Sequence, residues 1–421
     1  MRPRPADDRR TTHRQKERRT AVNVSPLFGR VVGIIVSGAF VAGASGDWPN
    51  FRGPNHDGIS REPDLKFEWK SPLPLVWERE VGSAFSSFAC VGDRVYTCGT
   101  QDKQQVLFCL NADTGAVLWQ KPFEPELVER QGGDGTRSTP TISDGRVYIL
   151  GGHGSLVCFD AAGGEEVWRR QFNSKPTWFY SGSVLVEGDL AIVSAGGSDG
   201  SLAAFDRKSG REVWKCGSDP VGYATPYPFT FNGRRYVAAF LGKCALIAEA
   251  ATGREVWRMP WQTDWDVNAS SPLFHDGYLF FSSGYRHGCI LLKLKADGDK
   301  LASETVWQST VLRNKFQSCV LHEGHLYTSD ETGLKCVEFL TGKEKWNHRR
   351  MKHGTVVLAD GHLFVLSENG ELLIAPATPA EFKPKTRAEI LSGRCWTVPV
   401  LHRGRLYARN LKRLVCFALR G

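Results

Sequence analysis

Short apolar runs recur along most of the chain, and each is bounded by a turn rich in Gly, Pro or Asp. An Asp-Gly turn at 144–145 opens the run at 146–150, and similar Gly turns open runs at 278–280, 325–327, 362–364 and 405–407. Such turns supply the positive φ that two-residue hairpins need. The pattern predicts many short antiparallel strands, and no helical periodicity interrupts it.

A tryptophan repeat groups these strands. Successive segments of the form Ala-x-Thr-Gly-x-x-x-Trp, or close variants, end at Trp119, Trp168, Trp214, Trp257 and Trp346, while Trp307 follows a stretched version and Trp77 has the ending without the turn. The spacings between consecutive members of this series are 42, 49, 46, 43, 50 and 39 residues. A period in the forties with four strands in each unit is typical of propeller blades.

The repeat predicts an all-β protein, an eight-bladed β-propeller of four-stranded antiparallel blades. Seven blades would follow if the last two shared strands. The predicted blades cover residues 83–120, 136–170, 180–216, 222–260, 267–309, 316–349, 353–391 and 392–421.

The two ends of the repeat array are incomplete. The last blade has three strands, and a spare strand at 74–80 precedes the first blade. We expect this N-terminal strand to complete the last blade, because an open ring would leave an unpaired strand edge. Within 353–391 the usual Trp turn is replaced by a Pro-rich segment at 375–384, which is either drift of the repeat or a loop placed for a partner.

The first 44 residues differ from the rest. They carry nine Lys/Arg and three Asp/Glu, so they hold +6 of the net charge of +9. A basic segment is followed by a 13-residue apolar run at 31–43 and by Ala42-Gly43-Ala44, which has the small-x-small form of a cleavage site. The run is too short to span a bilayer comfortably. We therefore predict a signal peptide at 1–44, the alternative being an uncleaved anchor, an N-terminal extension at 45–73 and a propeller at 74–421.

The predicted leader indicates where the mature protein acts, and the charge distribution argues against nucleic-acid binding. The predicted leader places the mature chain in the periplasm or cell envelope, with no membrane span of its own. The remaining chain carries only +3, so the basic pI is poor evidence for nucleic-acid binding.

The 11 cysteines cannot form a fully paired framework within one chain, because their number is odd. Cys109, Cys158, Cys336 and Cys416 occupy the same position in four repeats, which predicts small buried strand residues. No Cys-x-x-Cys-His motif occurs, so we expect no attached haem.

The Trp-ending segments resemble the PQQ-type β-propeller repeat over about residues 48–421. That repeat occurs in quinoprotein alcohol dehydrogenases, polyvinyl-alcohol-dehydrogenase-like proteins and the outer-membrane β-barrel assembly lipoprotein. The segments 48–58, 266–272, 283–285 and 395–399 are similar to a narrower set of exported PQQ-like proteins. The resemblance implies membership of this set and fixes no reaction, since fold does not determine function.

One candidate ligand site combines residues that begin several blades: Tyr223, Asn268, Arg313, Asn314 and Trp396. Arg137, Trp178, Tyr180 and Lys315 occupy comparable positions. If these segments face the central channel, they converge on one pocket that suits a flat anion, whether PQQ, an acidic glycan or a peptide carboxylate. The alternative is that they form the ordinary polar lining and Trp locks of a propeller.

A candidate metal site is Asp264, Asp266 and Asn268, whose oxygens alternate along the chain. In an extended strand they would point to one side. Ca²⁺ prefers such ligands, and PQQ dehydrogenases hold their quinone through Ca²⁺. The competing interpretation is an Asp/Asn turn that enters the next strand.

Three functions compete. The first is a non-catalytic exported propeller that binds a protein partner or a small anionic ligand, and we place it first. The second is a PQQ-dependent oxidoreductase acting on an alcohol or polymeric alcohol, which requires a general base beside a metal-bound quinone. The third, carbohydrate binding or cleavage, rests on exposed aromatic residues.

Overall fold

The computed structural model describes residues 46–69, 72–351 and 353–420. The predicted signal peptide at 1–44 lies outside these residues. In the described ranges no helix has the length and apolar character needed to cross a membrane.

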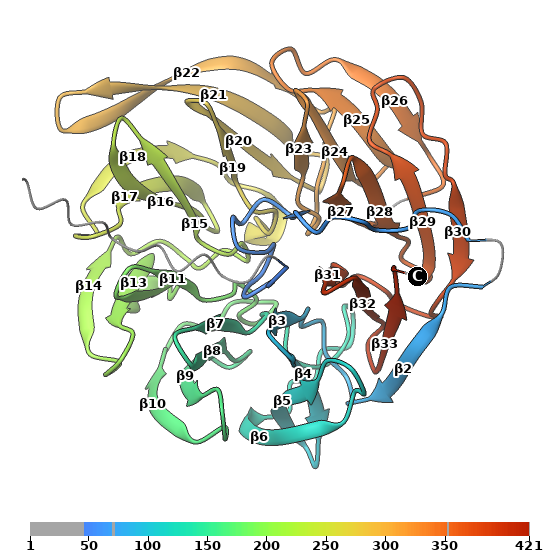
Figure 1. Cartoon of the computed structure of the whole chain (residues 1–421). Helices are drawn as coiled ribbons and strands as arrows, with labels where there is room; N and C mark the ends of the chain where they lie inside the picture. Colours follow the sequence, from blue (N-terminus) through green and yellow to red (C-terminus); the bar gives the residue numbers. More distant parts are fainter. Residues whose placement is uncertain (1–45, 70–71, 352, 421) are drawn as a thin grey trace, which may run out of the picture. The chain divides into compact units, whose positions relative to one another are not determined.

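Eight four-stranded antiparallel blades form a closed ring (Figure 1), as the repeat predicts. Blades one to four contain β3 (Ala89–Val91), β4 (Arg94–Gln101), β5 (Gln104–Asn111) and β6 (Val117–Pro125); β7 (Thr141–Ser143), β8 (Arg146–Leu150), β9 (Ser155–Asp160) and β10 (Glu166–Gln171); β11 (Leu185–Glu187), β12 (Leu190–Val193), β13 (Leu202–Asp206) and β14 (Glu212–Cys216); and β15 (Tyr227–Phe231), β16 (Arg234–Phe240), β17 (Cys244–Glu249) and β18 (Glu255–Pro260).

The second half of the ring repeats the arrangement. Blades five to eight contain β19 (Leu273–His275), β20 (Tyr278–Ser283), β21 (Gly288–Asp297) and β22 (Lys300–Ser309); β23 (Val320–His322), β24 (His325–Ser329), β25 (Leu334–Glu338) and β26 (Glu344–His348); β27 (Thr355–Ala359), β28 (His362–Leu366), β29 (Glu371–Pro376) and β30 (Thr386–Glu389); and β31 (Val400–His402), β32 (Arg405–Arg409), β33 (Arg413–Ala418) and β2 (Leu75–Glu80). Two short 3₁₀ turns, η1 (Gly197–Asp199) and η2 (Asp264–Asp266), lie between strands.

The N-terminal strand closes the ring. β2 pairs antiparallel with β33, as the spare strand predicts. Arg409 of the same blade is fully buried and donates hydrogen bonds to the carbonyls of Ser86 (3.0 Å) and Cys98 (2.7 Å) in blade one. Burial lowers the pKa of Arg409 to about 10. Blades eight and one are therefore joined both by chain pairing and by a buried guanidinium.

The repeated Trp and the repeated Gly meet across neighbouring blades. The Trp214 ring of blade three lies against Gly253 in the turn of blade four, where φ is +71° and an added Cβ would come 2.4 Å from the indole. Trp77, Trp119, Trp168 and Trp307 lie against the corresponding glycines of their next blades. The Trp ring thus needs a residue without a side chain, which explains the Gly of the motif.

Blade seven replaces this contact. Between β29 and β30 the Pro-rich loop places Phe382 on the Trp346 ring at 5.5 Å, and the Trp346 indole donates to the Thr378 carbonyl at 2.9 Å. The loop therefore packs against the repeat Trp of the preceding blade in place of the missing Gly turn.

All 11 cysteines are buried and unpaired. The four at the repeat position have no exposed surface. Burial raises the pKa of each of these four thiols; for Cys109, for example, the value rises to about 11. The prediction of small buried strand residues is confirmed.

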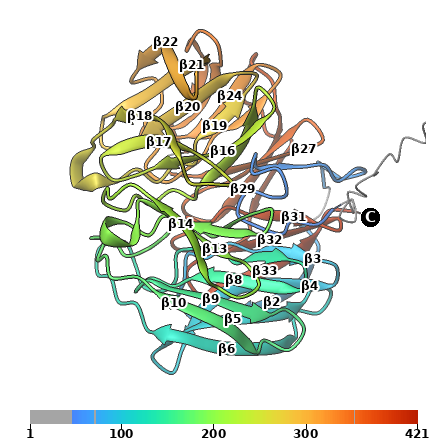
Figure 2. The ribbon, with the colours of Figure 1, turned by 90° about the vertical axis from the view of Figure 1, so that its left-hand side faces the viewer.

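Residues 46–69 form a segment that we call the strap, which crosses the centre of the ring in Figure 1 and lies on one face in Figure 2. Trp48 pairs with Cys90 of blade one, and β1 (Ile59–Ser60) adds parallel to β27 of blade seven. Arg52 donates to the Cys319 carbonyl in blade six, and the Glu62 carboxylate accepts from the Gly404 amide in blade eight. The strap thereby ties together blades that are far apart in sequence.

Candidate functional site

The loops that lead into the innermost strands surround a pocket of about 640 Å³ in the central channel. Eight aromatic residues line it: Phe51, Phe85, Trp178, Tyr223, Trp265, Tyr285, Phe316 and Trp396. Its volume lies in the range of ~300–1,000 Å³ that is usual for small-ligand sites.

A row of hydroxyl groups fixes this part of the channel. The amide of Ser87 donates to Thr139 Oγ1 (3.1 Å), the amide of Thr139 to Ser183 Oγ (2.9 Å), and the amide of Ser183 to Thr225 Oγ1 (2.9 Å). Each residue lies two positions before the first strand of its blade. The Ser or Thr at these blade starts therefore joins one blade to the next.

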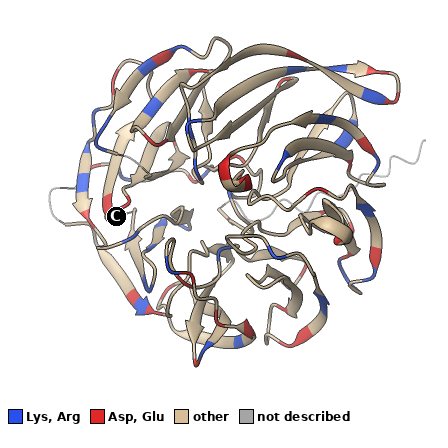
Figure 3. Ribbon diagram, turned by 180° about the vertical axis from the view of Figure 1, so that it is seen from behind, with Lys and Arg blue, Asp and Glu red and all other residues tan. Residues whose placement is uncertain are grey.

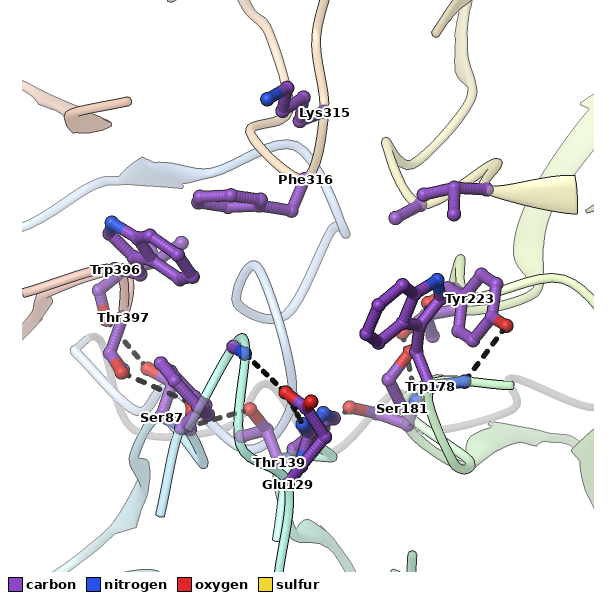
Figure 4. Close-up of a pocket in the computed structure, with 18 of the residues that line it drawn as sticks. Ser87, Glu129, Thr139, Trp178, Ser181, Tyr223, Lys315, Phe316, Trp396 and Thr397 are labelled. Atoms are coloured by element: carbon purple, nitrogen blue, oxygen red, sulfur yellow. Dashed lines mark hydrogen bonds and ion pairs between the residues drawn. The ribbon is translucent and has the colours of Figure 1, made fainter. Parts of the chain in front are cut away.

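Two opposite walls of the pocket are aromatic (Figure 4). On one side Trp396 lies 4.9 Å from Phe316 and stacks on Phe85 at 5.8 Å, between ring centroids. On the other side lie Trp178 and Tyr223, and the Tyr223 hydroxyl accepts from the Trp178 amide at 3.2 Å. Burial raises the pKa of Tyr223, so its phenol stays neutral at physiological pH.

The carboxylate of Glu129 is held in place. It accepts hydrogen bonds from the amides of Gln131 (2.7 Å) and Gly132, and it lies 3.6 Å from the Arg137 guanidinium. Burial alone would raise the pKa of Glu129, but these backbone hydrogen bonds and Arg137 lower it below its ordinary value. Glu129 is therefore an ionised, fully engaged carboxylate.

The cations of the pocket are also paired. The Arg137 guanidinium lies over the Phe85 ring at 5.6 Å. The Lys315 ammonium lies over the Tyr285 ring at 5.1 Å and 4.0 Å from the Glu331 carboxylate. Each positive charge therefore has both a ring and a carboxylate beside it.

The two ends of the pocket differ. Phe51 of the strap lines one end. Trp265, in the η2 turn, lines the other and is 69% exposed. Viewed from the face opposite to Figure 1, the acidic η2 turn lies at the centre of the ring (Figure 3). The pocket thus opens to solvent at the η2 face, while the strap crosses the opposite face.

The structure brings together two of the five residues of the predicted ligand site. Tyr223 and Trp396 line the pocket, and Arg313 does not. Asn268 and Asn314 are fully buried and bound to the fold: the Asn268 amide donates to the Leu241 carbonyl at 2.7 Å, and that of Asn314 to the Ser329 carbonyl at 2.9 Å. Of the comparable blade-start residues, Arg137, Trp178 and Lys315 line the pocket, whereas Tyr180 is buried in the core.

The predicted metal ligands lie on a turn instead of an extended strand. Asp264 and Asp266 belong to η2, where Trp265 and Asp266 have φ of +63° and +56°. The Asn268 oxygen accepts hydrogen bonds from Thr263 Oγ1 (3.3 Å) and Ser283 Oγ (2.7 Å). In the described part of the chain, no group of three or more His, Cys, Asp or Glu side chains could hold a metal ion.

Sequence reasoning missed Phe85, Glu129 and Phe316. Glu129 lies in the long loop between β6 and β7, outside any repeat position, so nothing in the repeat pointed to it. Phe85 and Phe316 each lie four residues before the first strand of a blade, β3 and β23. Trp396 occupies the same position before β31, and this shared spacing was the available signal.

The pocket fits a Ca²⁺-bound quinone poorly. Its lining supplies rings and two cations for a flat anion, but its one carboxylate, Glu129, is already hydrogen-bonded. Asp264 and Asp266 do not line the pocket, and Asn268 is engaged elsewhere. Among the described residues, the pocket lining therefore offers no free carboxylate for the metal.

Known proteins are similar to this chain in sequence profile, in direct sequence alignment and in solved structure. The sequence profile of the family described as outer membrane protein assembly factor BamB matches residues 68–218 and 245–421. An outer membrane protein assembly factor BamB of Burkholderia pseudomallei is 32% identical over 92 residues, which are 21% of this chain. The match spans only 24% of the length of that relative.

Solved structures share the fold at low identity. BamB from Moraxella catarrhalis aligns with a TM-score of 0.59 and 17% identity, over 82% of this chain and 99% of that chain. The quinohemoprotein alcohol dehydrogenase from Comamonas testosteroni aligns with a TM-score of 0.65 and 14% identity, over 90% and 82% of the two chains. Since the family profile matches more than three quarters of the sequence, this chain belongs to the family of the outer membrane protein assembly factor BamB.

Proposed function

We propose that this chain is an exported, non-catalytic binding propeller of the cell envelope, whose ligand or partner engages the open mouth of the central channel. The observation that carries the proposal is the state of Glu129. Among the described residues it is the only carboxylate that lines the pocket, and backbone amides and Arg137 keep it ionised and hydrogen-bonded. A carboxylate that acts as a general base must be free to take a proton from the reacting group.

The family supports a role in protein binding. Its described function is outer membrane protein assembly, and a propeller presents rigid loops on two faces, a form suited to holding a partner. Trp265 stands at the open mouth and is 69% exposed, and exposed Trp residues often carry much of the energy of a protein interface.

A second candidate is a PQQ-dependent oxidoreductase. The rings of the pocket together with Arg137 and Lys315 would favour a flat anion. This candidate requires a metal site, and the described residues supply no cluster of three or more His, Cys, Asp or Glu side chains for one.

The two candidates separate in one experiment. The chain from residue 45 onward is purified, PQQ and Ca²⁺ are added, and both the melting temperature and the dye-linked oxidation of ethanol and polyvinyl alcohol are measured. For a binding propeller we expect no oxidation. Dye reduction that depends on PQQ, together with a higher melting temperature, would establish the oxidoreductase instead.

A second measurement addresses the partner. A photo-crosslinking residue is placed at Trp265 and, as a control, at Val213, an exposed position on an outer strand. We expect adducts with envelope proteins from position 265 and none from position 213. Equal labelling from both positions would contradict a partner site at the channel mouth.

A further inference from the structure

Half of the tryptophans that do not belong to the repeat lie around the channel pocket. Seven of the 13 occupy the repeat position and lock blades together. Six do not: Trp48, Trp69, Trp178, Trp261, Trp265 and Trp396. Three of these six, Trp178, Trp265 and Trp396, line the channel pocket. The fold itself gives no reason for this grouping, because blade packing uses the other seven.

Trp265 is held against its own backbone preference. Its φ is +63°, a left-handed conformation that bulky residues rarely adopt, and its ring is 69% exposed. Local strain of this kind persists where the surrounding structure enforces it, and it is concentrated at binding sites. The turn thus keeps an exposed ring at the edge of the pocket.

Hydrogen-bond donors accompany the rings. Thr139, Ser183 and Thr225 each accept a backbone amide through the hydroxyl oxygen, and among the described residues none has an acceptor for its own hydroxyl proton. All three line the pocket. The buried Nε1 of Trp178 also has no partner among the described residues. A buried donor without a partner is costly, so a ligand that brings oxygen acceptors would satisfy these groups.

The pocket has no strong preference for charge. Arg137 lies beside Glu129, and Lys315 lies beside Glu331. Asp264 and Asp266 flank Trp265, which lines the pocket, and add negative charge to the η2 turn. The carboxylates therefore offset the positive charges of Arg137 and Lys315, and the rings and hydroxyl groups are the main recognition elements.

We propose that the channel mouth binds a neutral oligosaccharide of pyranose sugars. This inference rests on the proposed function and names the ligand class of that site. A pyranose ring presents a face of weakly positive C–H groups, which stacks on the negative face of an indole, and a rim of oxygen acceptors. Trp265 supplies an exposed stacking surface, whereas the Trp396 ring already packs against Arg394 at 4.4 Å and Phe85 at 5.8 Å. Thr139, Ser183, Thr225 and Trp178 supply the donors.

The test is a titration of the chain from residue 45 onward with cellopentaose, maltopentaose and chitopentaose, followed by calorimetry and by tryptophan fluorescence. We expect saturable binding of at least one of the three. Trp265→Ala should weaken it about tenfold, and the exposed outer-strand variant Val213→Ala should leave it unchanged. Because the Trp265 ring is exposed, this variant is expected to fold.

A second variant isolates the donor. Trp178→Phe keeps an aromatic ring and removes the Nε1 hydrogen, so we expect affinity to fall about threefold to tenfold with no decrease in the melting temperature of the free protein. Equal affinity of Trp178→Phe and the parent protein would overturn the role of this donor.

The outcomes distinguish the inference from the function beneath it. If none of the three sugars binds, or if Trp265→Ala and Val213→Ala behave alike, the sugar proposal is wrong and a binding propeller still stands. If a sugar binds and chromatography shows it cleaved, the ligand class is right and the non-catalytic function is wrong. If PQQ raises the melting temperature and none of the sugars binds, the ligand class is wrong.

Discussion

Trp257 and Trp265 are eight residues apart and have opposite roles. Trp257 is 8% exposed and donates to Ser303 Oγ at 3.1 Å, as a member of the repeat. Trp265 is exposed and lies outside the repeat. We expect Trp257→Ala to lower the free energy of unfolding by about 3–5 kcal/mol and Trp265→Ala to change it by less than about 0.5 kcal/mol. Urea unfolding of both variants checks this, and comparable losses would contradict the separation of structural from binding tryptophans.

The strap contains a pH-sensitive residue, His56. Burial, and next the positive charge of Arg235, lower its pKa from 6.5 to about 4, although Glu187 and Asp57 oppose the shift. Between pH 6.5 and 4 the unfolded chain therefore binds a proton that the folded chain does not, and stability falls as the pH falls through this window. The penalty is complete below pH 4.

We expect His56→Asn to reduce this loss, since Asn tolerates the φ of 57° found at this position and does not titrate. Unfolding free energies at pH 7.5 and 4.5 should differ more for the parent protein than for the variant, on the order of 1 kcal/mol. The other histidines are present in both proteins, so their contributions to the pH dependence cancel in this comparison. The same pH dependence in both would show that His56 is protonated normally in the fold.

At the scale of the elements, the Gly turn of five blades is a contact with a repeat Trp as well as a turn. Gly253 and Gly233 have φ of +71° and +72°, but an added Cβ would meet Trp214 only at Gly253. We expect each Gly→Ala variant to lose about 1–2 kcal/mol through its backbone conformation, and Gly253→Ala to lose about 1–3 kcal/mol more through the clash. Thermal and urea unfolding measure the difference. Equal losses would show that the Trp ring moves aside freely.

The sequence allowed the strands and blades to be predicted because their signals are local. The Asp-Gly turn at 144–145 and the strand that follows it are set by a few neighbouring residues. The role of Asn268 was not predictable in this way. Its polarity and blade-start position resemble those of Tyr223, and only the packing of the Leu241 and Trp261 carbonyls around it shows that its amide is part of the fold.

The residues of the candidate site also fall into two groups, those at repeat positions and those in irregular loops. Trp396 and Tyr223 are large and begin their blades, so their side chains reach the channel. Glu129 comes from an irregular loop, and its contact with Arg137 depends on how that loop folds back. Periodicity carries no information about such a loop.

At the scale of the whole molecule, β2 closes the ring by pairing with β33 of the last blade. A chain that starts at residue 81 lacks β2 and exposes the edge of β33, whereas a chain that starts at residue 72 lacks only the strap. We expect the shorter chain to melt at a lower temperature than the longer one and to self-associate through the free edge. Calorimetry and size-exclusion chromatography test this. A monomeric shorter chain with an unchanged melting temperature would contradict closure by β2.

The strap has a consequence for any polymeric ligand. Because the strap crosses one face and its Phe51 lines the pocket, we expect a chain molecule to enter and leave by the mouth at Trp265. A polymer of any length then occupies the pocket with one terminus only. The molar amount of protein bound by a given mass of polymer should rise each time the polymer is cut, so the protein would respond to the number of chain ends and hence to how far a polymer has been degraded.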